Sequence, residues 1–275
     1  MKIINSILLL VLVSTGVFAQ SNVGMQGSPN FRELGGLINK EGRTLKEGML
    51  YRSGSFADLK VDDAALLRET GINTIIDFRS DSEIAREPDF IPEGMQVNYL
   101  NAPIGSLDQK GMGKFMQVLT SPDFKEADVE QLMIEANLGF VDYIADFKPL
   151  FDQVQAPETV VLFHCTAGKD RTGLASSLLL HILDFDRSTI FQDFMLSNEA
   201  VSKLDLGKMK AYGIPEDRAA LVMGVKESYL ESAWTAIEAK YGSIDTMLQQ
   251  VFGIDAQAKA NLKAKYLVNW LDSTY

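Results

Sequence analysis

The stretch that decides the fold runs from Thr159 to Leu180 and reads TVVLFHCTAGKDRTGLASSLLL. It begins with a short apolar run rich in β-branched residues, which predicts a buried strand, and ends with an apolar run that predicts a buried helix. Between them lies a tight polar loop that contains Cys165, the single cysteine of the chain, and Arg171 six positions later. A strand, a loop and a helix in this order predict a cradle for an anion at the helix N-terminus.

The chemistry that fits such a loop is phosphoryl transfer through a cysteine. An ordinary thiol, with a pKa of about 8.5, is mostly un-ionised at pH 7, so a nucleophilic cysteine needs its thiolate stabilised. Backbone N–H groups of residues 166–171 can converge first on the thiolate and then on the oxygens of a phosphate. Arg171 adds a planar fork for two phosphate oxygens, and Thr172 can hydrogen-bond the sulfur as it leaves.

Two other interpretations of the loop are weaker. A lone cysteine is usually a small buried hydrophobe, but this one is placed in a polar turn six residues before an arginine. A nucleotide-binding loop needs a Ser or Thr after its lysine, whereas Lys169 is followed by Asp170, and no glycine opens the loop. A phosphate-binding module without turnover stays as an alternative from another class, although Cys165, Arg171 and Thr172 are all present.

The residues around Cys165 resemble a known family. His164-Cys165-x5-Arg171-Thr172-Gly173 resembles the signature of protein tyrosine phosphatases, and the fuller run over residues 167–171 resembles a bacterial branch of secreted tyrosine and phosphoinositide phosphatases. Four more segments resemble motifs of that branch: Asn30-Phe31-Arg32-Glu33-Leu34-Gly35-Gly36, Tyr51-Arg52-Ser53-Gly54, Asp77-Phe78-Arg79-Ser80 and Tyr241-Gly242-Ser243. The resemblance covers nearly all of the chain that follows the N-terminal apolar segment.

The resemblance implies a fold, an activity and a set of site residues. The fold is an α/β protein with a central, mainly parallel sheet flanked by helices, a helical lid insertion and C-terminal helices. The activity is that of a tyrosine phosphatase-type phosphomonoesterase with a cysteinyl-phosphate intermediate, possible dual specificity, and phosphoinositides or inositol phosphates as the alternative substrates. The expected phosphate ligands come from the loop itself: Thr166, Ala167, Gly168, Lys169, Arg171 and Thr172.

Two residues are candidates for the acid that protonates the leaving group. In many cysteine phosphatases the loop after the strand expected here at residues 95–100 supplies an aspartic acid, but the nearest acid, Asp108, comes several residues later. The other candidate is Asp170 inside the cradle, where bound phosphate favours the protonated form of a neighbouring carboxyl. Asp170 is preferred, and its alternative role is to hold Lys169 or a loop N–H in place.

Three further residues are expected to support the site. His164 is expected to fix the loop and favour the thiolate. Asp77 ends a strand expected at residues 73–78, where it could position other groups or form an ion pair with Arg79. Arg32 is placed near the active site by the resemblance, with a surface ion pair as the alternative. Because the chain has two histidines and shows no carboxylate cluster with metal-ligand spacing, no metal and no cofactor are expected.

The N-terminal residues predict export. A charged start, an apolar core and a small residue at Ala19 are typical of a signal peptide over residues 1–19, which leaves one phosphatase domain over residues 20–275. The apolar run is shorter than the roughly 20 residues that a spanning helix needs, which disfavours a membrane anchor. The expected location is therefore periplasmic or extracellular, with no stable membrane insertion.

The net charge indicates which partners the chain can have, and the apolar periodicity predicts its remaining helices and strands. A net charge of −11 disfavours nucleic acid and favours a phosphorylated protein or a small phosphoester as the partner. A helix over residues 62–71 followed by a strand predicts αβ alternation and a parallel sheet. Residues 107–157 carry an apolar stripe at helical spacing from Phe140 to Phe151, which by default packs on the sheet. The lid that the resemblance implies would lie in the same segment, from Gly111 to Glu135, and composition does not decide between the two. From about residue 200 the chain is expected to be helical.

Overall fold

The computed structural model describes residues 25–105, 109–201, 206–210 and 213–269, so the expected signal peptide and Asp108 lie outside the described residues. At its centre is a five-stranded sheet in the order β1-β3-β6-β4-β5. The strands are β1 (Arg32–Glu33), β3 (Leu50–Ser53), β6 (Val161–His164), β4 (Thr74–Asp77) and β5 (Asn98–Asn101). Only β1 runs antiparallel to its neighbour, which confirms the mainly parallel sheet expected from the alternation of helix and strand.

The strand that precedes the cysteine loop is the middle strand of this sheet. It pairs with β3 on one side and β4 on the other, and both Ser53 and Asp77 are in register with His164. Three strands therefore end at the same level, and β6, which leads into the cysteine loop, lies between the other two. This is the edge at which ligands bind in open parallel sheets.

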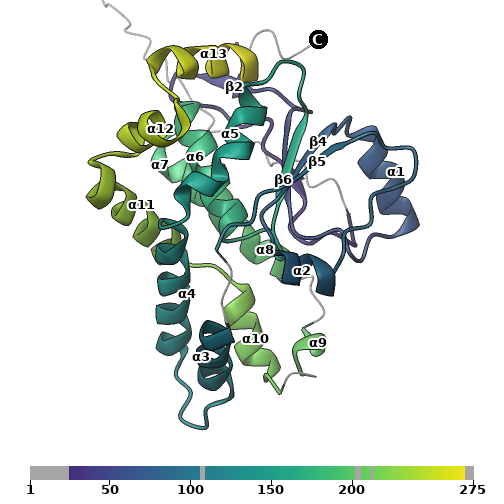
Figure 1. Cartoon of the computed structure of the whole chain (residues 1–275), viewed down its shortest axis with the longest axis vertical. Coiled ribbons are helices and arrows are strands. Elements are labelled where there is room, and N and C mark those ends of the chain that lie inside the picture. Colours follow the sequence, from purple (N-terminus) through teal and green to yellow (C-terminus); the bar gives the residue numbers. More distant parts are fainter. Residues whose placement is uncertain (1–24, 106–108, 202–205, 211–212, 270–275) are drawn as a thin grey trace, which may run out of the picture.

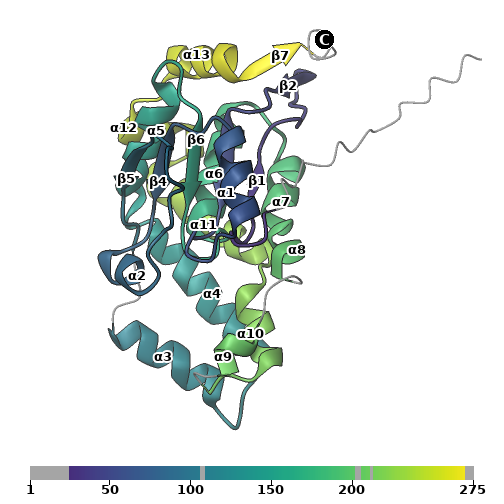
Figure 2. The ribbon, with the colours of Figure 1, turned by 90° about the vertical axis from the view of Figure 1, so that its right-hand side faces the viewer.

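Helices cover both faces of the sheet. One face carries α1 above a small apolar cluster, and the other carries α5 and α6 (Figures 1 and 2). The helices are α1 (Val61–Glu69), α2 (Asp81–Arg86), α3 (Gln109–Thr120), α4 (Glu126–Phe140), α5 (Lys148–Gln155), α6 (Arg171–Ile182), α7 (Arg187–Met195), α8 (Ser197–Val201), α9 (Gly207–Lys210), α10 (Glu216–Met223), α11 (Glu227–Tyr241), α12 (Ile244–Phe252) and α13 (Ala256–Tyr266). The expected helical C-terminal part is thus present.

The helix after the cysteine loop is buried along almost its whole length, as its apolar sequence predicts. A glycine in its first turn explains how a neighbouring helix can approach so closely. A Cβ atom on Gly173 would lie 2.6 Å from the ring of Phe194, so a side chain there would push α7 away from α6. This close packing brings the residues of α7 next to the loop.

The segment before β6 is helical, but its apolar stripe does not lie on one helix. The helix α4 ends at Phe140, and after a short turn the chain forms the 3-10 helix η1 (Ile144–Phe147) and then α5. A proline at the start of α5 favours a new helix there rather than a continuation. Tyr143 falls in this turn and is half exposed, so it does not belong to the buried part of the stripe, which includes Ile144, Phe147, Leu150 and Phe151.

Four helices extend the molecule beyond the sheet. The helices α3, α4, α9 and α10 form the lower part of Figures 1 and 2, and α4 packs lengthwise against α11. Arg218 of α10 ties this part together, since its guanidinium donates to the carbonyls of Leu119 and Ser121 at 2.8 Å each. The segment in which a lid is expected is therefore a pair of helices, α3 and α4, packed on the C-terminal helices.

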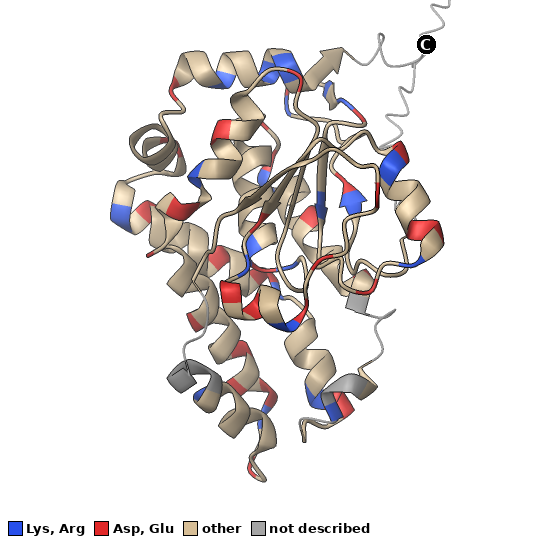
Figure 3. Cartoon of the chain, turned by 45° about the vertical axis from the view of Figure 1, so that its right-hand side comes forward, with Lys and Arg blue, Asp and Glu red and all other residues tan. Residues whose placement is uncertain are grey.

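A segment from the N-terminal part of the chain pairs with the end of the described chain in a second, small sheet. The strands β2 (Arg43–Leu45) and β7 (Leu267–Asn269) pair antiparallel beside α13. None of the helices in the described ranges is long and apolar enough to cross a bilayer. In the view of Figure 3, basic residues are interspersed with acidic ones along the ribbon.

Candidate active site

Residues outside the loop of residues 165–170 hold it in place by donating hydrogen bonds to its carbonyl groups. The carbonyl of Thr166 accepts from the backbone N–H of Ser55 at 3.0 Å. The carbonyl of Gly168 accepts from Arg52 Nη2 at 2.9 Å and from Asn30 Nδ2 at 2.6 Å. The contacts come from two segments far away in sequence, so the loop conformation depends on tertiary packing.

The backbone N–H groups of the same loop are free. From residue 166 to residue 170, none of them donates to an acceptor in the described part of the chain. The hydroxyl of Thr172 is also buried without a hydrogen-bond partner among those residues, and Cys165 is only 3% exposed. Successive backbone N–H groups without a protein acceptor form anion-binding concavities, so this row beside a cysteine fits an anion as its acceptor.

A glycine inside the loop allows this conformation. Gly168 has φ +67°, a left-handed conformation that side chains disfavour. A Cβ atom there would lie 2.4 Å from the backbone of Ser53, where no rotation of a side chain could relieve the overlap. The loop and the end of β3 can approach this closely only with glycine at this position.

Arg171 is held at the mouth of the loop by an acid from another element. Its Nη1 and Nη2 donate to the two carboxylate oxygens of Glu83 at 3.0 and 2.6 Å, and Nη1 also donates to the carbonyl of Phe78 at 3.0 Å. Thr166 Oγ1 donates to the same carboxylate at 2.6 Å. The end of the guanidinium is therefore fully occupied by protein groups, while Nε has no acceptor among the described residues.

The electrostatics of this pair keep both groups charged. Burial would raise the pKa of Glu83, but the hydrogen bonds and charge of Arg171 outweigh it and hold the pKa at about 2. Burial opposes the charge on Arg171, yet Glu83, together with the nearby Cys165 and Asp170, raises its pKa. Arg171 is thus a permanent cation close to the sulfur.

Asp170, the preferred acid, is paired with its neighbour in the sequence. Lys169 Nζ lies 2.7 Å from Asp170 Oδ2, and the lysine itself is buried. The other oxygen of Asp170 accepts a long hydrogen bond of 3.5 Å from Asn137 of α4. The alternative role of Asp170, that it holds Lys169, is therefore present in the structure, and Lys169 does not point freely into solvent.

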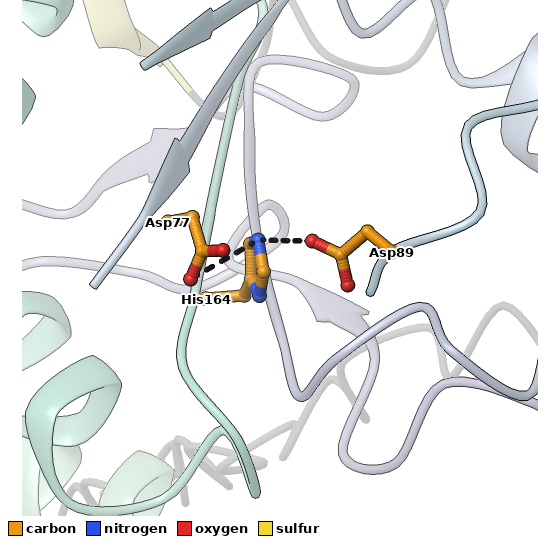
Figure 4. A group of neighbouring side chains, drawn as sticks. All are labelled: Asp77, Asp89 and His164. Atoms are coloured by element: carbon orange, nitrogen blue, oxygen red, sulfur yellow. Dashed lines mark ion pairs between the residues drawn. The ribbon is translucent and has the colours of Figure 1, made fainter. Parts of the chain in front are cut away.

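His164 lies in a buried ionic cluster next to the cysteine, which we call the His164 cluster: Asp77, Arg79, Asp89 and His164. Figure 4 shows three of its members, Asp77, Asp89 and His164. Arg79 Nη2 lies 2.8 Å from Asp77 Oδ2 and 2.7 Å from Asp89 Oδ2. His164 Nδ1 lies 3.3 Å from the carbonyl oxygen of Cys165. The expected ion pair between Asp77 and Arg79 is thus present, and Asp77 lies behind the loop rather than at its mouth.

This cluster also bears on the expectation that the chain has no metal site. The structure brings Asp77, Asp89 and His164 together, with one potential ligand atom from each within 4.8 Å of the others. The sequence showed no such group, because Asp89 is separated from the others in the chain. The guanidinium of Arg79, however, contacts both carboxylates, and a metal ion would have to share them with this fixed cation.

A second buried cluster, the Asp193 cluster, lies on the other side of the loop and consists of Arg32, Arg52 and Asp193. Arg32 Nε lies 3.1 Å from Asp193 Oδ1, and Arg52 Nη1 lies 2.5 Å from Asp193 Oδ2. Arg32 also donates to the side chain of Asn30, which in turn holds the loop. Arg32 therefore acts on the site through Asn30 and is buried, which excludes the surface ion pair considered from the sequence.

Sequence reasoning missed several residues of this site. Arg52 and Asn30 lie inside motifs that were noticed without a role being assigned to them. Glu83 follows Ser80 by three residues, and the spacing Ser-x-x-Glu is the signal of a capping box, which the structure contains at α2. Asp89, Asn137 and Asp193 carried no sequence signal, because only the folded chain brings them to the loop.

Comparison with known proteins identifies the class. The sequence model of the tyrosine phosphatase family matches residues 23–268. A protein of Cupriavidus necator whose name describes a tyrosine-protein phosphatase is 32% identical over 244 residues, which cover 86% of this chain and 85% of that protein. The triple specificity protein phosphatase PtpB of Mycobacterium tuberculosis is 28% identical over 270 residues, covering 86% of this chain and 95% of PtpB.

A solved structure is also similar, but only weakly. The crystal structure of P. aeruginosa TpbA in complex with pTyr matches with 18% identity and a TM-score of 0.30, over 66% of this chain and 89% of that chain. This likeness is too low to carry an argument. The family match and the two relatives suffice to show that the chain belongs to the tyrosine phosphatase family.

The family membership fixes the general activity. The protein is a protein tyrosine phosphatase-type enzyme that acts on a phosphorylated substrate. Its sheet, with a cysteine loop between the central strand and a buried helix, is the α/β arrangement of that class.

Proposed function

We propose that this protein hydrolyses phosphotyrosine in proteins, with Cys165 as the nucleophile and a cysteinyl-phosphate intermediate. The observation that carries the proposal is the row of free backbone N–H groups over residues 166–170 beside Cys165, with Arg171 fixed at the mouth of the loop. Phosphotyrosine is proposed as the substrate because two relatives that match 86% of this chain carry the names of tyrosine or triple specificity phosphatases.

In the first step the Cys165 thiolate attacks phosphorus, the bond from phosphorus to the tyrosyl oxygen breaks, and Asp170 gives its proton to that oxygen. The free N–H groups and Nε of Arg171 hold the phosphoryl oxygens. In the second step water attacks phosphorus, Asp170 takes up a proton from it, and the bond to sulfur breaks to release inorganic phosphate. Thr172, whose hydroxyl lacks a partner among the described residues, donates to the leaving sulfur.

Glu83 has a positioning role in this scheme. It occupies the end of the Arg171 guanidinium, so the edge that carries Nε stays available to the phosphoryl group. Fixing the arginine in advance lowers the reorganisation needed when charge shifts in the transition state.

Lys169 bears on the alternative substrates. Phosphoinositides and soluble inositol phosphates carry a second phosphate, which a free lysine beside the cradle would attract. Lys169 is buried and its Nζ lies 2.7 Å from Asp170 Oδ2, but it has no hydrogen-bond partner among the described residues. The choice of phosphotyrosine therefore rests on the names of the relatives and not on Lys169.

The test compares variants of the chain over residues 20–275 on substrates with different leaving groups, with a chelator present. Cys165→Ser should have no turnover, and acid-quenched wild-type protein should carry phosphate on Cys165, detected by mass spectrometry. Asp170→Asn should lose about 100-fold or more on phosphotyrosine peptide and much less on a substrate with a very good leaving group. Turnover that survives Cys165→Ser would reject the mechanism, and an equal loss of Asp170→Asn on all substrates would reject the acid role.

A substrate panel tests the specificity. Phosphotyrosine peptides should give the highest kcat/KM, above phosphoserine peptides, phosphothreonine peptides and soluble inositol phosphates. Higher kcat/KM on inositol phosphates would replace the proposed substrate class without changing the mechanism. The control is Lys169→Met, which should reduce activity on all substrates alike if the lysine serves the loop.

Export is proposed on the N-terminal sequence. Residues 1–19 have the charged start, apolar core and small residue of a cleaved signal peptide, so the enzyme would act outside the cytoplasm on substrates found there. Expression of the full chain in a bacterial host, followed by fractionation and N-terminal sequencing, tests this. Processed protein that starts at Gln20 is expected in the periplasm or the medium, and unprocessed protein in the cytoplasm would contradict the proposal.

A further inference from the structure

One buried polar side chain of α4, that of Asn137, faces the acid of the proposed mechanism. The buried residues of this helix are Val129, Met133 and Asn137, which are spaced four residues apart and therefore lie on one side of α4. Asn137 is 1% exposed, although its side chain is polar. Packing alone would favour an apolar residue in such a row, so the amide needs a reason of its own.

The carbonyl of Met133 fixes the orientation of the Asn137 amide. Nδ2 carries two hydrogens, and a backbone carbonyl can only accept. Nδ2 donates one hydrogen to the Met133 carbonyl at 2.9 Å, and the other serves Asp170 Oδ1 at 3.5 Å. With the amide turned over, two oxygen atoms would face each other at Met133, and neither could donate. Asp170 therefore meets a donor at this place.

Asp170 directs its side chain away from the helix that it precedes. It is the N-cap residue of α6, a position from which an aspartate usually accepts from a backbone N–H group of the first turn. In the described part of the chain its side chain makes no such hydrogen bond. Instead, Oδ2 lies 2.7 Å from Lys169 Nζ and Oδ1 faces Asn137. The carboxyl is thus placed between a lysine of the loop and an amide that comes from another element.

The helix α4 is itself fastened on the side that carries Asn137. Glu130 lies two turns before Asn137 on the same side of the helix. Its carboxylate accepts from Lys226 Nζ at 2.8 Å and from Ser228 Oγ at 2.9 Å, at the start of α11. Because α11 packs along α4, the contact between these two helices sets the place of Asn137 relative to the loop.

We infer that Asn137 is a positioning residue that holds the carboxyl of Asp170 in the orientation from which it protonates the leaving oxygen. In that step the O–H bond of Asp170 breaks as the tyrosyl oxygen takes the proton, while phosphorus loses this oxygen and bonds to the sulfur of Cys165. Hydrogen bonds of catalytic groups often tighten only in the complex with substrate, so a distance of 3.5 Å is compatible with this role. The inference rests on the proposed function, in which Asp170 is the acid.

The leaving group distinguishes this role from a merely structural one. An acid is important for a poor leaving group such as the tyrosyl oxygen, and much less so for a very good one such as dinitrophenolate. We expect Asn137→Leu to lower kcat/KM about tenfold on a phosphotyrosine peptide and less than about twofold on dinitrophenyl phosphate. Inorganic phosphate should inhibit the variant as strongly as the wild type, because the loop itself is unchanged.

The matched control is Gln131→Leu, which also replaces an amide of α4. Gln131 is exposed and donates to Glu135 at 3.2 Å on the same helix, so its loss should leave kcat/KM unchanged on both substrates. Equal losses of kcat/KM on the two substrates in Asn137→Leu would overturn the inference. No loss on either substrate, or the same loss in Gln131→Leu, would overturn it as well.

A double variant tests whether Asn137 acts through Asp170. In a chain that already carries Asp170→Asn, the further change Asn137→Leu should cost nothing more on the phosphotyrosine peptide, because the group that it positions is gone. Losses that multiply in the double variant would mean that Asn137 acts independently of the acid, and the inference would be wrong.

Thermal unfolding first shows whether Asn137→Leu folds. If it does not, Asn137→Ala, which removes the amide without adding bulk, takes its place with the same expected results. A failure of the proposed function has a different signature: Asp170→Asn would lose equally on both substrates, and the inference about Asn137 would fall with it. If Asp170→Asn loses far more on the peptide and the Asn137 variant does not, the inference alone is overturned.

Discussion

The two buried ionic clusters on either side of the cysteine loop differ in their charge balance. The Asp193 cluster has two guanidinium groups for one carboxylate, and the His164 cluster has two carboxylates for one guanidinium. Burial, and then repulsion from Arg32, lower the pKa of Arg52 to about 10, although Asp193 works against this. The surplus positive charge contacts the carbonyl of Gly168 directly, whereas the surplus negative charge is separated from the loop by His164.

This difference shows how a loop can be built to attract an anion. Both clusters contact loop carbonyls, and neither contacts a loop N–H group, so the donors stay available on the inner side. The cluster with surplus positive charge touches the loop itself. The cluster with surplus negative charge reaches the loop through His164, whose Nδ1 lies 3.3 Å from the carbonyl oxygen of Cys165.

The largest effect is expected from removing the acid of the Asp193 cluster. Asp193→Ala would leave Arg32 and Arg52 buried together without a counter-charge, and breaking a buried pair in this way costs about 3–5 kcal/mol. Urea unfolding measures the loss of unfolding free energy. The control is Asp245→Ala, which removes an exposed carboxylate and should cost less than about 1 kcal/mol. Similar losses for the two variants would contradict the prediction that the buried Asp193 cluster stabilises the fold.

The next effect concerns the point at which the Asp193 cluster meets the loop. Gly168→Ala would force a side chain into a left-handed conformation, at about 1–2 kcal/mol, and against the backbone of Ser53. The loop would shift, and a displacement of about 1 Å can lower kcat/KM about 100-fold. Gly139→Ala in α4 meets open space and should keep full activity. Activity of Gly168→Ala near that of the wild type would contradict the close contact.

A smaller effect depends on pH and concerns the Glu83–Arg171 pair. The pKa of Glu83 is about 2 in the folded protein against a usual 4.5, so the pair stabilises the fold fully above pH 4.5 and loses this contribution as pH falls towards 2. With allowance for partial exposure, the wild type should lose about 1–2 kcal/mol more than Glu83→Gln between pH 5 and pH 2.5. Parallel curves of unfolding free energy against pH for the two proteins would contradict the prediction.

The smallest effect is expected at the exposed side of the His164 cluster. Tyr99→Phe removes a hydroxyl that donates to both carboxylates, but Tyr99 is 36% exposed, so water can partly replace it. The expected loss is about 1 kcal/mol or less, measured by thermal unfolding, with little change in kcat. A loss of unfolding free energy as large as that of Asp193→Ala would contradict this, because the Tyr99 hydroxyl would then contribute as much as the buried carboxylate of Asp193.

Much of the fold and the chemical centre could be predicted from the sequence. The strand, the loop and the helix around Cys165 are contiguous in the chain, and their apolar runs fall on the elements that the structure contains. The alternation of helix 61–69 with strand 74–77 also predicted the parallel sheet correctly. The apolar stripe near Tyr143 misled, because helical spacing does not reveal where one helix stops and the next begins.

Sequence by itself thus determined where the proposed nucleophile Cys165 and Arg171 stand, since local spacing alone sets them six residues apart around one loop. Only the tertiary structure decided which acids serve these groups. Glu83, Asp89 and Asp193 come from three separate segments, and they reach the loop because β3, β6 and β4 end at the same level and α7 packs closely on Gly173. Ion pairs form between groups that the packing brings together, and no spacing along the chain encodes that choice.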